Sequence, residues 1–146
     1  MTEFVSEIKT IPHPDADVYA VLSDLNNLKP AQKTIPRDKI KDFTFDTDSC
    51  TLSVDPVGKI RLVVVERKPD STIKFRAEQL PFDVTMWIQL APAGNGETKM
   101  KLTVKADLNP FLKPMIGKPL QAGLDKVAEG LAGLPYNEIL NKGTIE

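Results

Sequence analysis

The order of the predicted elements indicates an α+β fold in which one antiparallel sheet packs against one long helix. A strand and a short helical stretch open the chain, six strand-like runs follow without a helix between them, and an apolar helix closes it. Strands joined by short turns pair antiparallel, and the sheet they form needs a cover on one face. The closing helix is the only predicted element long enough to cover it. We therefore expect a curved sheet around this helix, with a cavity between them for an apolar small molecule.

The first strand is predicted over residues 3–11, because polar and apolar residues alternate there. One face of this strand holds Phe4, Ser6 and Ile8. Pro14 suits the first position of a helix, whose apolar residues recur at helical spacing: Val18, Val21, Leu22 and Leu25. A second short helix is predicted over residues 27–33.

Six further strands are predicted at short intervals after a loop over residues 34–38. They cover residues 39–45, 50–54, 58–67, 73–79, 82–90 and 99–108. The run Ala93-Gly94-Asn95-Gly96 is typical of a hairpin turn. In the last strand, apolar residues alternate with lysines and threonine, so we expect one face of the sheet to be buried and the other solvated.

The closing helix begins with a capping residue and ends at a glycine. Asn109 can cap it, and Gly133 stops it. Because Pro114 and Pro119 each remove a helical hydrogen bond, we expect a distorted segment over residues 110–117 and a main helix over 118–132. Residues 1–136 then form a single domain, and residues 137–146 form a flexible tail.

The proline-containing segment has two interpretations. It is either a bend that lays the helix across the sheet, or a lid over the cavity whose unbonded carbonyls, those of Pro110 and Met115, meet water or ligand. Gly117 adds backbone freedom to this segment. The bend is the favoured interpretation.

Short motifs spread along the chain have a familiar order: Phe4-Val5-Ser6, Val18-Tyr19, Ser23-Asp24-Leu25, Gly58-Lys59-Ile60, Val65-Glu66-Arg67-Lys68-Pro69 and Gly96-Glu97-Thr98-Lys99. With the order of elements, they resemble the START-related (SRPBCC) superfamily, which includes birch-pollen-allergen-like proteins, polyketide cyclases and lipid-transfer domains. The resemblance implies a helix-grip fold: a seven-stranded curved antiparallel sheet wrapped around a long C-terminal helix, with two short helices after the first strand. It also implies a hydrophobic ligand, such as a lipid, sterol or polyketide-like molecule, between sheet and helix.

The candidate ligand-binding residues are the apolar side chains expected to face inward from the sheet and the closing helix. They are Ile60, Leu62, Val64, Ile73, Phe75, Val84, Met86, Ile88, Met100, Leu102, Val104, Phe111, Leu112, Met115, Ile116, Leu120 and Leu124, with Val127 beside them. Methionine side chains repack easily and suit an adaptable wall. The alternative is that these residues simply fill a core of normal density.

Catalysis is the second function that we consider, in the form of a cyclase or aromatase. Alternation after Val64 places Glu66 on the inward face, where a carboxyl group can act as a general acid or base. Tyr19 can offer a hydroxyl group. Structural roles are favoured for both, with Arg76 as an ion-pair partner of Glu66, so we expect binding rather than catalysis.

Trp87 raises a third possibility, a protein-interaction module. It alternates with Met86 and Ile88, so either its face is the inward one or its ring covers the outer face of the sheet. An exposed tryptophan can mark a contact surface. Ordinary packing is favoured, and the sequence identifies no protein partner.

Composition and motifs limit the remaining classes of function. The chain has 146 residues, 19 basic and 20 acidic, and Lys99, Lys101 and Lys105 form a solvated strand face, so we expect no nucleic-acid partner. One cysteine, Cys50, and one histidine, His13, cannot make an internal disulfide or an ordinary zinc site, and no phosphate-binding loop occurs, so no metal or cofactor is expected. No apolar run approaches the length of a membrane span, and the start lacks the pattern of a signal peptide. A cytoplasmic location is expected.

Overall fold

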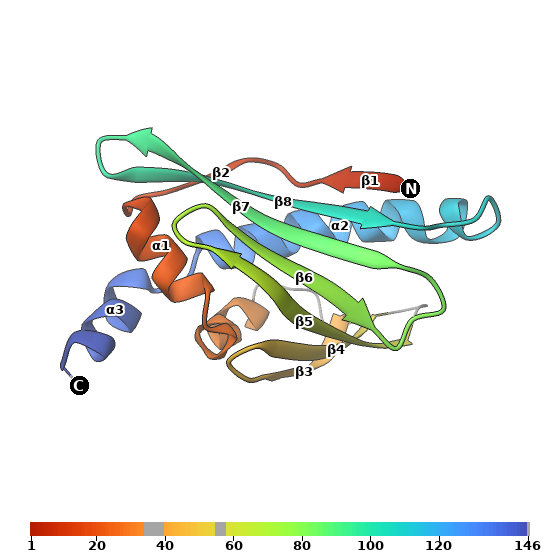
Figure 1. Ribbon diagram of the computed structural model, residues 1–146, viewed down its shortest axis with the longest axis horizontal. Coiled ribbons are helices and arrows are strands. Elements are labelled where there is room, and N and C mark those ends of the chain that lie inside the picture. The colour runs from red at the N-terminus through yellow and green to blue at the C-terminus, as the bar shows by residue number, and fades with distance from the viewer. Residues whose placement is uncertain (34–39, 55–57, 146) are drawn as a thin grey trace.

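The computed structural model describes residues 1–33, 40–54 and 58–145, and it confirms the α+β helix-grip prediction. One antiparallel sheet has the strand order β1-β8-β7-β6-β5-β4-β3, with β2 also paired to β8. Helix α2 lies along one face of this sheet, and α1, η1 and α3 gather toward one end (Figure 1). The strands are β1 (Thr2–Val5), β2 (Lys9–Ile11), β3 (Ile40–Phe45), β4 (Ser49–Val54), β5 (Gly58–Lys68), β6 (Thr72–Glu78), β7 (Val84–Gly94) and β8 (Glu97–Ala106). The helices are α1 (Asp15–Leu22), the 3₁₀ helix η1 (Leu25–Lys33), α2 (Leu112–Ala132) and α3 (Tyr136–Ile145).

The six strands predicted after the loop are all present, with ends that differ by a few residues. The largest difference is at β7, which continues to Gly94 and enters the predicted hairpin turn directly. Asn95 and Gly96 both have positive φ there, which is the conformation of the tight turns that fit the twist of paired strands. The predicted loop over residues 34–38, and residue 39 of the next predicted strand, lie outside the described residues.

The predicted first strand is split into β1 and β2, which both pair with β8. At the break, Ser6 N–H donates to Leu102 O, and Leu102 N–H donates to Ser6 Oγ, each over 2.8 Å. The hydroxyl thus replaces a backbone group in the ladder, and the alternation is lost after it. The prediction that Ile8 shares a face with Phe4 is wrong, because Ile8 is exposed and Phe4 packs against the core.

The same break ties helix α2 to the edge of the sheet. Gln121 Nε2 donates to Val5 O over 2.9 Å, and Asp125 Oδ1 accepts from Glu7 N–H over 2.9 Å. Backbone groups that β1 and β2 leave unpaired are therefore bonded by two side chains one helical turn apart. This fastening lies near the middle of α2.

Helix α2 is continuous, so the prediction of a distorted segment followed by a separate main helix is wrong. Asn109 caps its first turn as predicted, because Asn109 Oδ1 accepts from Phe111 N–H and Leu112 N–H at 2.9 and 2.8 Å. The carbonyls that Pro114 and Pro119 leave without helical donors belong to Pro110 and Met115, and both residues are exposed to water. Pro114 lies in the first turn of α2, where N–H groups have no helical acceptor, so only Pro119 removes a bond inside the helix and α2 stays continuous.

Within the predicted tail, residues 137–145 continue helix α3, which packs against α1, and the flexibility of this tail stays a prediction. Its first residue, Tyr136, is buried, and its hydroxyl donates to Leu131 O over 2.7 Å. Burial raises the pKa of Tyr136. Tyr136, the last residue of the predicted domain, therefore contributes a large side chain to the core.

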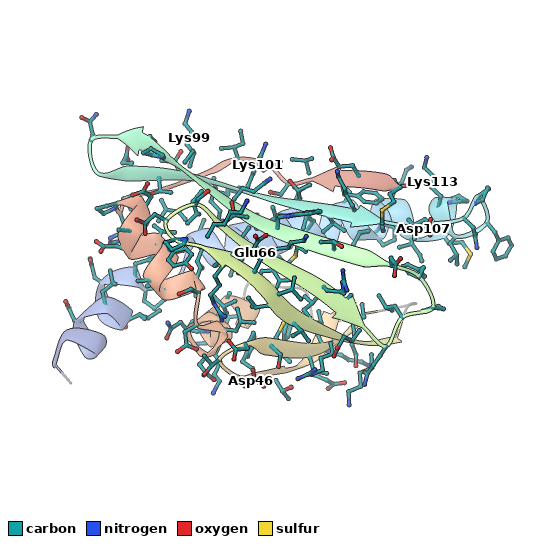
Figure 2. The ribbon with its side chains drawn as sticks, in the orientation of Figure 1. Asp46, Glu66, Lys99, Lys101, Asp107 and Lys113 are labelled. Atoms are coloured by element: carbon teal, nitrogen blue, oxygen red, sulfur yellow. The ribbon has the colours of Figure 1, made fainter. Side chains whose placement is uncertain are left out.

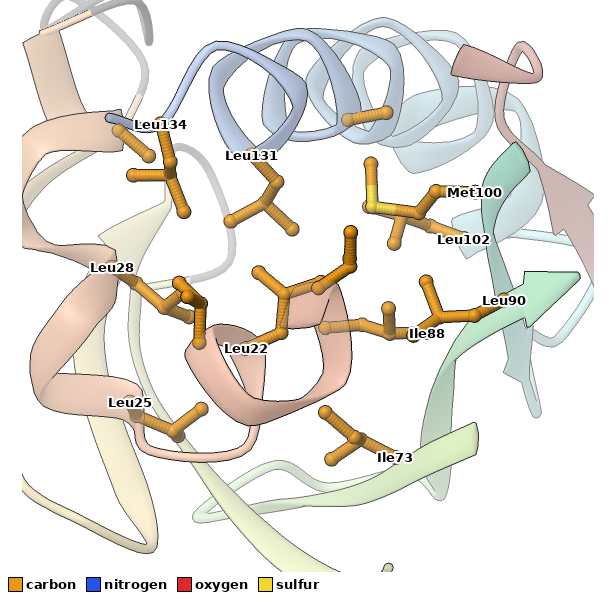
Figure 3. Packing of buried hydrophobic residues seen from close by; sticks show 14 of the residues in the cluster. Leu22, Leu25, Leu28, Ile73, Ile88, Leu90, Met100, Leu102, Leu131 and Leu134 are labelled. Atoms are coloured by element: carbon orange, nitrogen blue, oxygen red, sulfur yellow. The ribbon is translucent and has the colours of Figure 1, made fainter. Parts of the chain in front are cut away.

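Buried hydrophobic side chains gather around α1 and η1 (Figure 3). Leu22 and Leu25 belong to one buried cluster with Ile73, Ile88 and Leu131 of α2. The fully buried side chains of this region include Val18, Val21, Leu22, Leu25, Ile73, Ile88, Met100, Leu102 and Tyr136. This end of the molecule is a sealed core.

Candidate ligand-binding site

The strand register places the predicted inward residues of β5 to β8 on one face. Val64 pairs with Phe75, Phe75 pairs with Met86, and Met86 pairs with Val104. Residues paired across antiparallel strands share a face, so alternate residues of each strand extend the same apolar surface. This face carries the core, as the sequence predicts.

Burial along this face is uneven. On β7, Ile88 is 1% exposed, whereas Val84 and Met86 are only half buried. On β5, Leu62 and Val64 are also half buried although both pack against the core cluster. Apolar surface therefore remains accessible to water on the inward side of β5 and at the start of β7.

The position of α2 accounts for this difference. Its main contacts are with η1, β1, β2 and β8, so it covers the β8 side of the sheet rather than the β5 side. Within its N-terminal half, Leu120 is half buried and packs against the core cluster, whereas Leu124 and Ala128 in the next turns are buried. The candidate site is the half-buried apolar surface between β5, the start of β7 and the N-terminal half of α2.

The predicted ligand-binding residues fall into three groups. Ile73, Phe75, Ile88, Met100, Leu102, Val104, Ile116 and Leu124 are buried. Ile60, Leu62, Val64, Val84, Met86, Leu112, Leu120 and Val127 are half buried. Phe111 and Met115 are exposed, at 75% and 49%.

The expectation that Phe111 and Met115 face inward is wrong. In the continuous helix, Ile116, Leu120 and Leu124 follow one another at spacings of four and form the stripe toward the core. Phe111 and Met115 are also four apart but lie on a different stripe, which faces solvent.

Aromatic side chains outside the predicted ligand-binding set also lie on this side. Phe43 and Phe45 on β3 are half buried against the core cluster, and their rings are parallel, with centroids 5.7 Å apart. Phe4 on β1 is half buried as well and lies 3.9 Å from the position that a Cβ on Gly117 would take. The spacing of two between Phe43 and Phe45 is a signal that could have identified them.

Glu66 does not face the site, which corrects the prediction from alternation. The register between β5 and β6 shifts after Val64, so that Glu66 pairs with Lys74, and Lys74 pairs with Trp87 on the outer face. One extra residue, Val65, forms this bulge and reverses the alternation beyond it. Figure 2 shows Glu66 on the side of the sheet away from α2.

Beyond the bulge, Arg67 takes the register position opposite the buried Ile73. Its guanidinium donates to Ser23 O at 2.8 Å, to Thr47 O at 3.2 Å and to Asp48 Oδ1 at 2.8 Å. Arg67 therefore joins the end of α1 to the β3–β4 turn, and its role is structural.

Tyr19 lies on α1, half buried against the core cluster. Since α1 packs on the inward side of the sheet and Glu66 lies on the outer side, the two candidate catalytic residues do not form one site.

Trp87 lies on the outer face, which decides between its two interpretations. Lys74 Nζ and Lys105 Nζ are 5.7 and 5.8 Å from the ring centroid, so two ammonium groups make cation–π contacts with it. A role for Trp87 in protein interaction stays a prediction.

The shifted pKa values also mark structural positions. Desolvation raises the pKa of the Cys50 thiol to about 12, so that it stays protonated at neutral pH. Hydrogen bonds from the Ser49 hydroxyl and from backbone N–H groups of the β3–β4 turn lower the pKa of Asp46. Across residues 1–33, 40–54 and 58–145, no three His, Cys, Asp or Glu side chains gather as a metal site would require.

The sequence matches the family described as "Polyketide cyclase / dehydrase and lipid transport" over residues 1–134, so this chain belongs to that family. The protein TTHA0849 of Thermus thermophilus has a similar structure, with 22% identity, a TM-score of 0.63 and coverage of 90% of this chain and 94% of that one. A START superfamily protein of Mycobacterium smegmatis is 16% identical, with a TM-score of 0.58 and coverage of 90% and 94%. Norcoclaurine synthase of Thalictrum flavum, solved with dopamine and hydroxybenzaldehyde, is 13% identical, with a TM-score of 0.66 and coverage of 90% and 85%.

These structural similarities establish the fold alone. The comparison with curated proteins gives no match. Among the described helices, none combines the length and the apolar character needed to cross a bilayer.

Proposed function

We propose that this protein binds a hydrophobic small molecule, of the lipid, sterol or polyketide-like kind, between the sheet and the N-terminal half of α2. The observation that carries the proposal is the set of half-buried apolar side chains on β5, β7 and α2, on the face that elsewhere forms a sealed core. Membership of a family named for polyketide cyclases and lipid transport supports it.

The chemistry of this surface indicates how a ligand would be held. Leu62, Val64, Met86 and Leu120 offer only apolar atoms, so affinity comes from the surface removed from water, about 25 cal/mol per Å². Specificity then depends on the shape of the ligand more than on hydrogen bonds.

Binding is favoured over acid–base catalysis because of where the candidate groups lie. Glu66 is on the outer face and cannot reach a ligand held on the inner one. Tyr19 cannot share an acid–base site with Glu66, since the two residues lie on opposite sides of the sheet.

The test is a fluorescence titration with N-phenyl-1-naphthylamine, followed by displacement with fatty acids and sterols. We expect saturable binding by the folded protein. Val64→Phe adds bulk at the half-buried surface, so we expect it to weaken binding about tenfold, in line with the cost of overpacking, whereas Val65→Phe at the neighbouring exposed position leaves it unchanged.

Circular dichroism confirms that both variants are folded. A wild type without saturable dye binding, or equal losses in the two variants, would contradict the proposal. Native mass spectrometry of the protein purified from its own cells would then identify the class of any retained ligand.

A further inference from the structure

The start of α2 presents large apolar side chains to water. Phe111 is 75% exposed and Met115 is 49% exposed, and with a spacing of four they lie on one stripe of the helix. Lys118 continues that stripe one turn later and is also exposed. We call Phe111, Lys113, Met115 and Lys118 the α2 tip.

The charge of this segment has one sign. Residues 108–124 contain no aspartate or glutamate but include Lys113 and Lys118. The positive end of the helix dipole lies at the same place. Asp107, just before this segment, and Asp83 are exposed acidic residues joined by a backbone hydrogen bond of 2.9 Å.

The α2 tip lies beside the candidate site. Leu112, Ile116 and Leu120 interleave with its residues along the same turns of α2 and belong to the half-buried or buried stripe. Figure 1 shows the start of α2 at the end of the molecule opposite α1 and α3, and Figure 2 shows Lys113 at that end. A surface that contacts the α2 tip therefore also lies next to the candidate site.

We propose that the α2 tip docks on an anionic phospholipid bilayer, so that an apolar ligand passes between the bilayer and the site without crossing water. Exposed Phe111 and Met115 would enter the interface, where apolar side chains gain by leaving water. Lys113 and Lys118 would meet the anionic headgroups. This inference rests on the proposed function, because it assigns the source of the ligand.

Charge favours this occupant over a second copy of the chain. A two-fold contact through the α2 tip would bring its own pair of lysines against the same pair in the partner, and like charges in contact repel. A lipid surface of negative charge complements both lysines at once.

The first experiment is flotation with vesicles of phosphatidylcholine alone and of phosphatidylcholine mixed with phosphatidylglycerol. We expect the wild type to float with the mixed vesicles. Phe111→Ser with Met115→Ser is expected to reduce the bound fraction about tenfold or more, because burial of such side chains is favourable. The control, Ile8→Ser with Val65→Ser, removes exposed apolar side chains elsewhere and is expected to bind as the wild type does.

The second experiment tests the charges. Lys113→Gln and Lys118→Gln are each expected to weaken binding to mixed vesicles about 5-fold and to reduce its dependence on salt. Lys99→Gln with Lys101→Gln, on exposed positions of β8, is the matched control. Failure of the wild type to bind mixed vesicles, or equal losses in tip and control variants, would overturn the proposal.

Dye binding without vesicles separates the two proposals. We expect the Phe111→Ser, Met115→Ser protein to bind N-phenyl-1-naphthylamine normally and to lose only vesicle binding. If the wild type binds dye but no vesicles, only the docking proposal is refuted. If it floats with vesicles but binds no dye, the proposed function is refuted and, with it, the transfer of a ligand. Concentration-dependent dimerisation that is lost in the same double variant would show a second copy as the occupant and also overturn docking.

Discussion

At the residue scale, a single extra residue in β5 determines which side chains reach the interior. Alternation from Ile60 to Val64 holds, but the bulge at Val65 exchanges the faces beyond it, so that Arg67 and not Glu66 lies on the inward side. The fork of donors on Arg67 then satisfies two backbone carbonyls and one carboxylate in a region where the chain turns.

We expect Arg67→Lys to lower the free energy of unfolding by about 1–2 kcal/mol, because one ammonium group cannot make this set of hydrogen bonds. Urea denaturation measures the change. The matched variant is Arg61→Lys, whose exposed ion pair with Glu78 is expected to contribute less than about 1 kcal/mol. Similar losses in the two variants would show that the bonds of Arg67 contribute no more than a surface pair.

At the element scale, two glycines of α2 differ in their surroundings, since Gly130 is in close contact with η1 and Gly117 has open space beside it. A Cβ on Gly130 would lie 2.9 Å from Ala31 O on η1, whereas a Cβ on Gly117 would meet only Phe4, at 3.9 Å. Gly130 therefore lets helix and 3₁₀ helix approach closely, and Gly117 serves no such contact.

We expect Gly130→Ala to destabilise the protein by about 1–3 kcal/mol, because backbone must move to admit the methyl group. Gly117→Ala is expected to stabilise it by about 0.5–1 kcal/mol through helix propensity. Thermal unfolding followed by circular dichroism compares the two. A neutral Gly130→Ala variant would mean that η1 can move away from α2 at little cost.

The elements that the sequence predicts well are those with a clean period. The strands from β4 to β8 and the cap at Asn109 follow from alternation, turn residues and a capping amide. Two features escape such reasoning. A bulge adds a residue without any change in residue type, and a proline in the sequence does not show whether the helix continues through it.

At the scale of the whole molecule, the apolar face divides into a sealed end near α1 and a half-buried end under the start of α2. The sequence predicts which residues share this face, since pairing follows from alternation. It does not predict how far each one is covered, because coverage depends on where α2 is fastened, and that depends on hydrogen bonds from Gln121 and Asp125 to distant backbone groups. Phe111 and Met115 were misplaced for the related reason that the helix is continuous.

We expect amide hydrogen exchange to report this division directly. Residues 112–118 of α2 are expected to exchange faster than residues 124–132, since Pro119 withholds the bond to Met115 O and the latter segment packs in the core. Pro119→Ala restores that bond and is expected to slow exchange over 112–118. Pro69→Ala, in the exposed turn after β5, is the control.

Uniformly slow exchange along α2 in the wild type would show that residues 112–118 do not open separately from the rest of the helix. It would contradict the lid interpretation of the prolines and support a simple bend. Slower exchange over 112–118 on addition of dye would associate this segment with the bound state.

The attachment of α2 at its midpoint has one more consequence. Gln121 and Asp125 anchor this helix to the margin of the sheet, so the turns before the anchor and the turns after it are held by different contacts. Under the proposed function, ligands of different size would displace the leading turns while the far half keeps its packing in the core. The proposed function would thus combine tolerance toward ligand size with a fixed core in a protein of 146 residues.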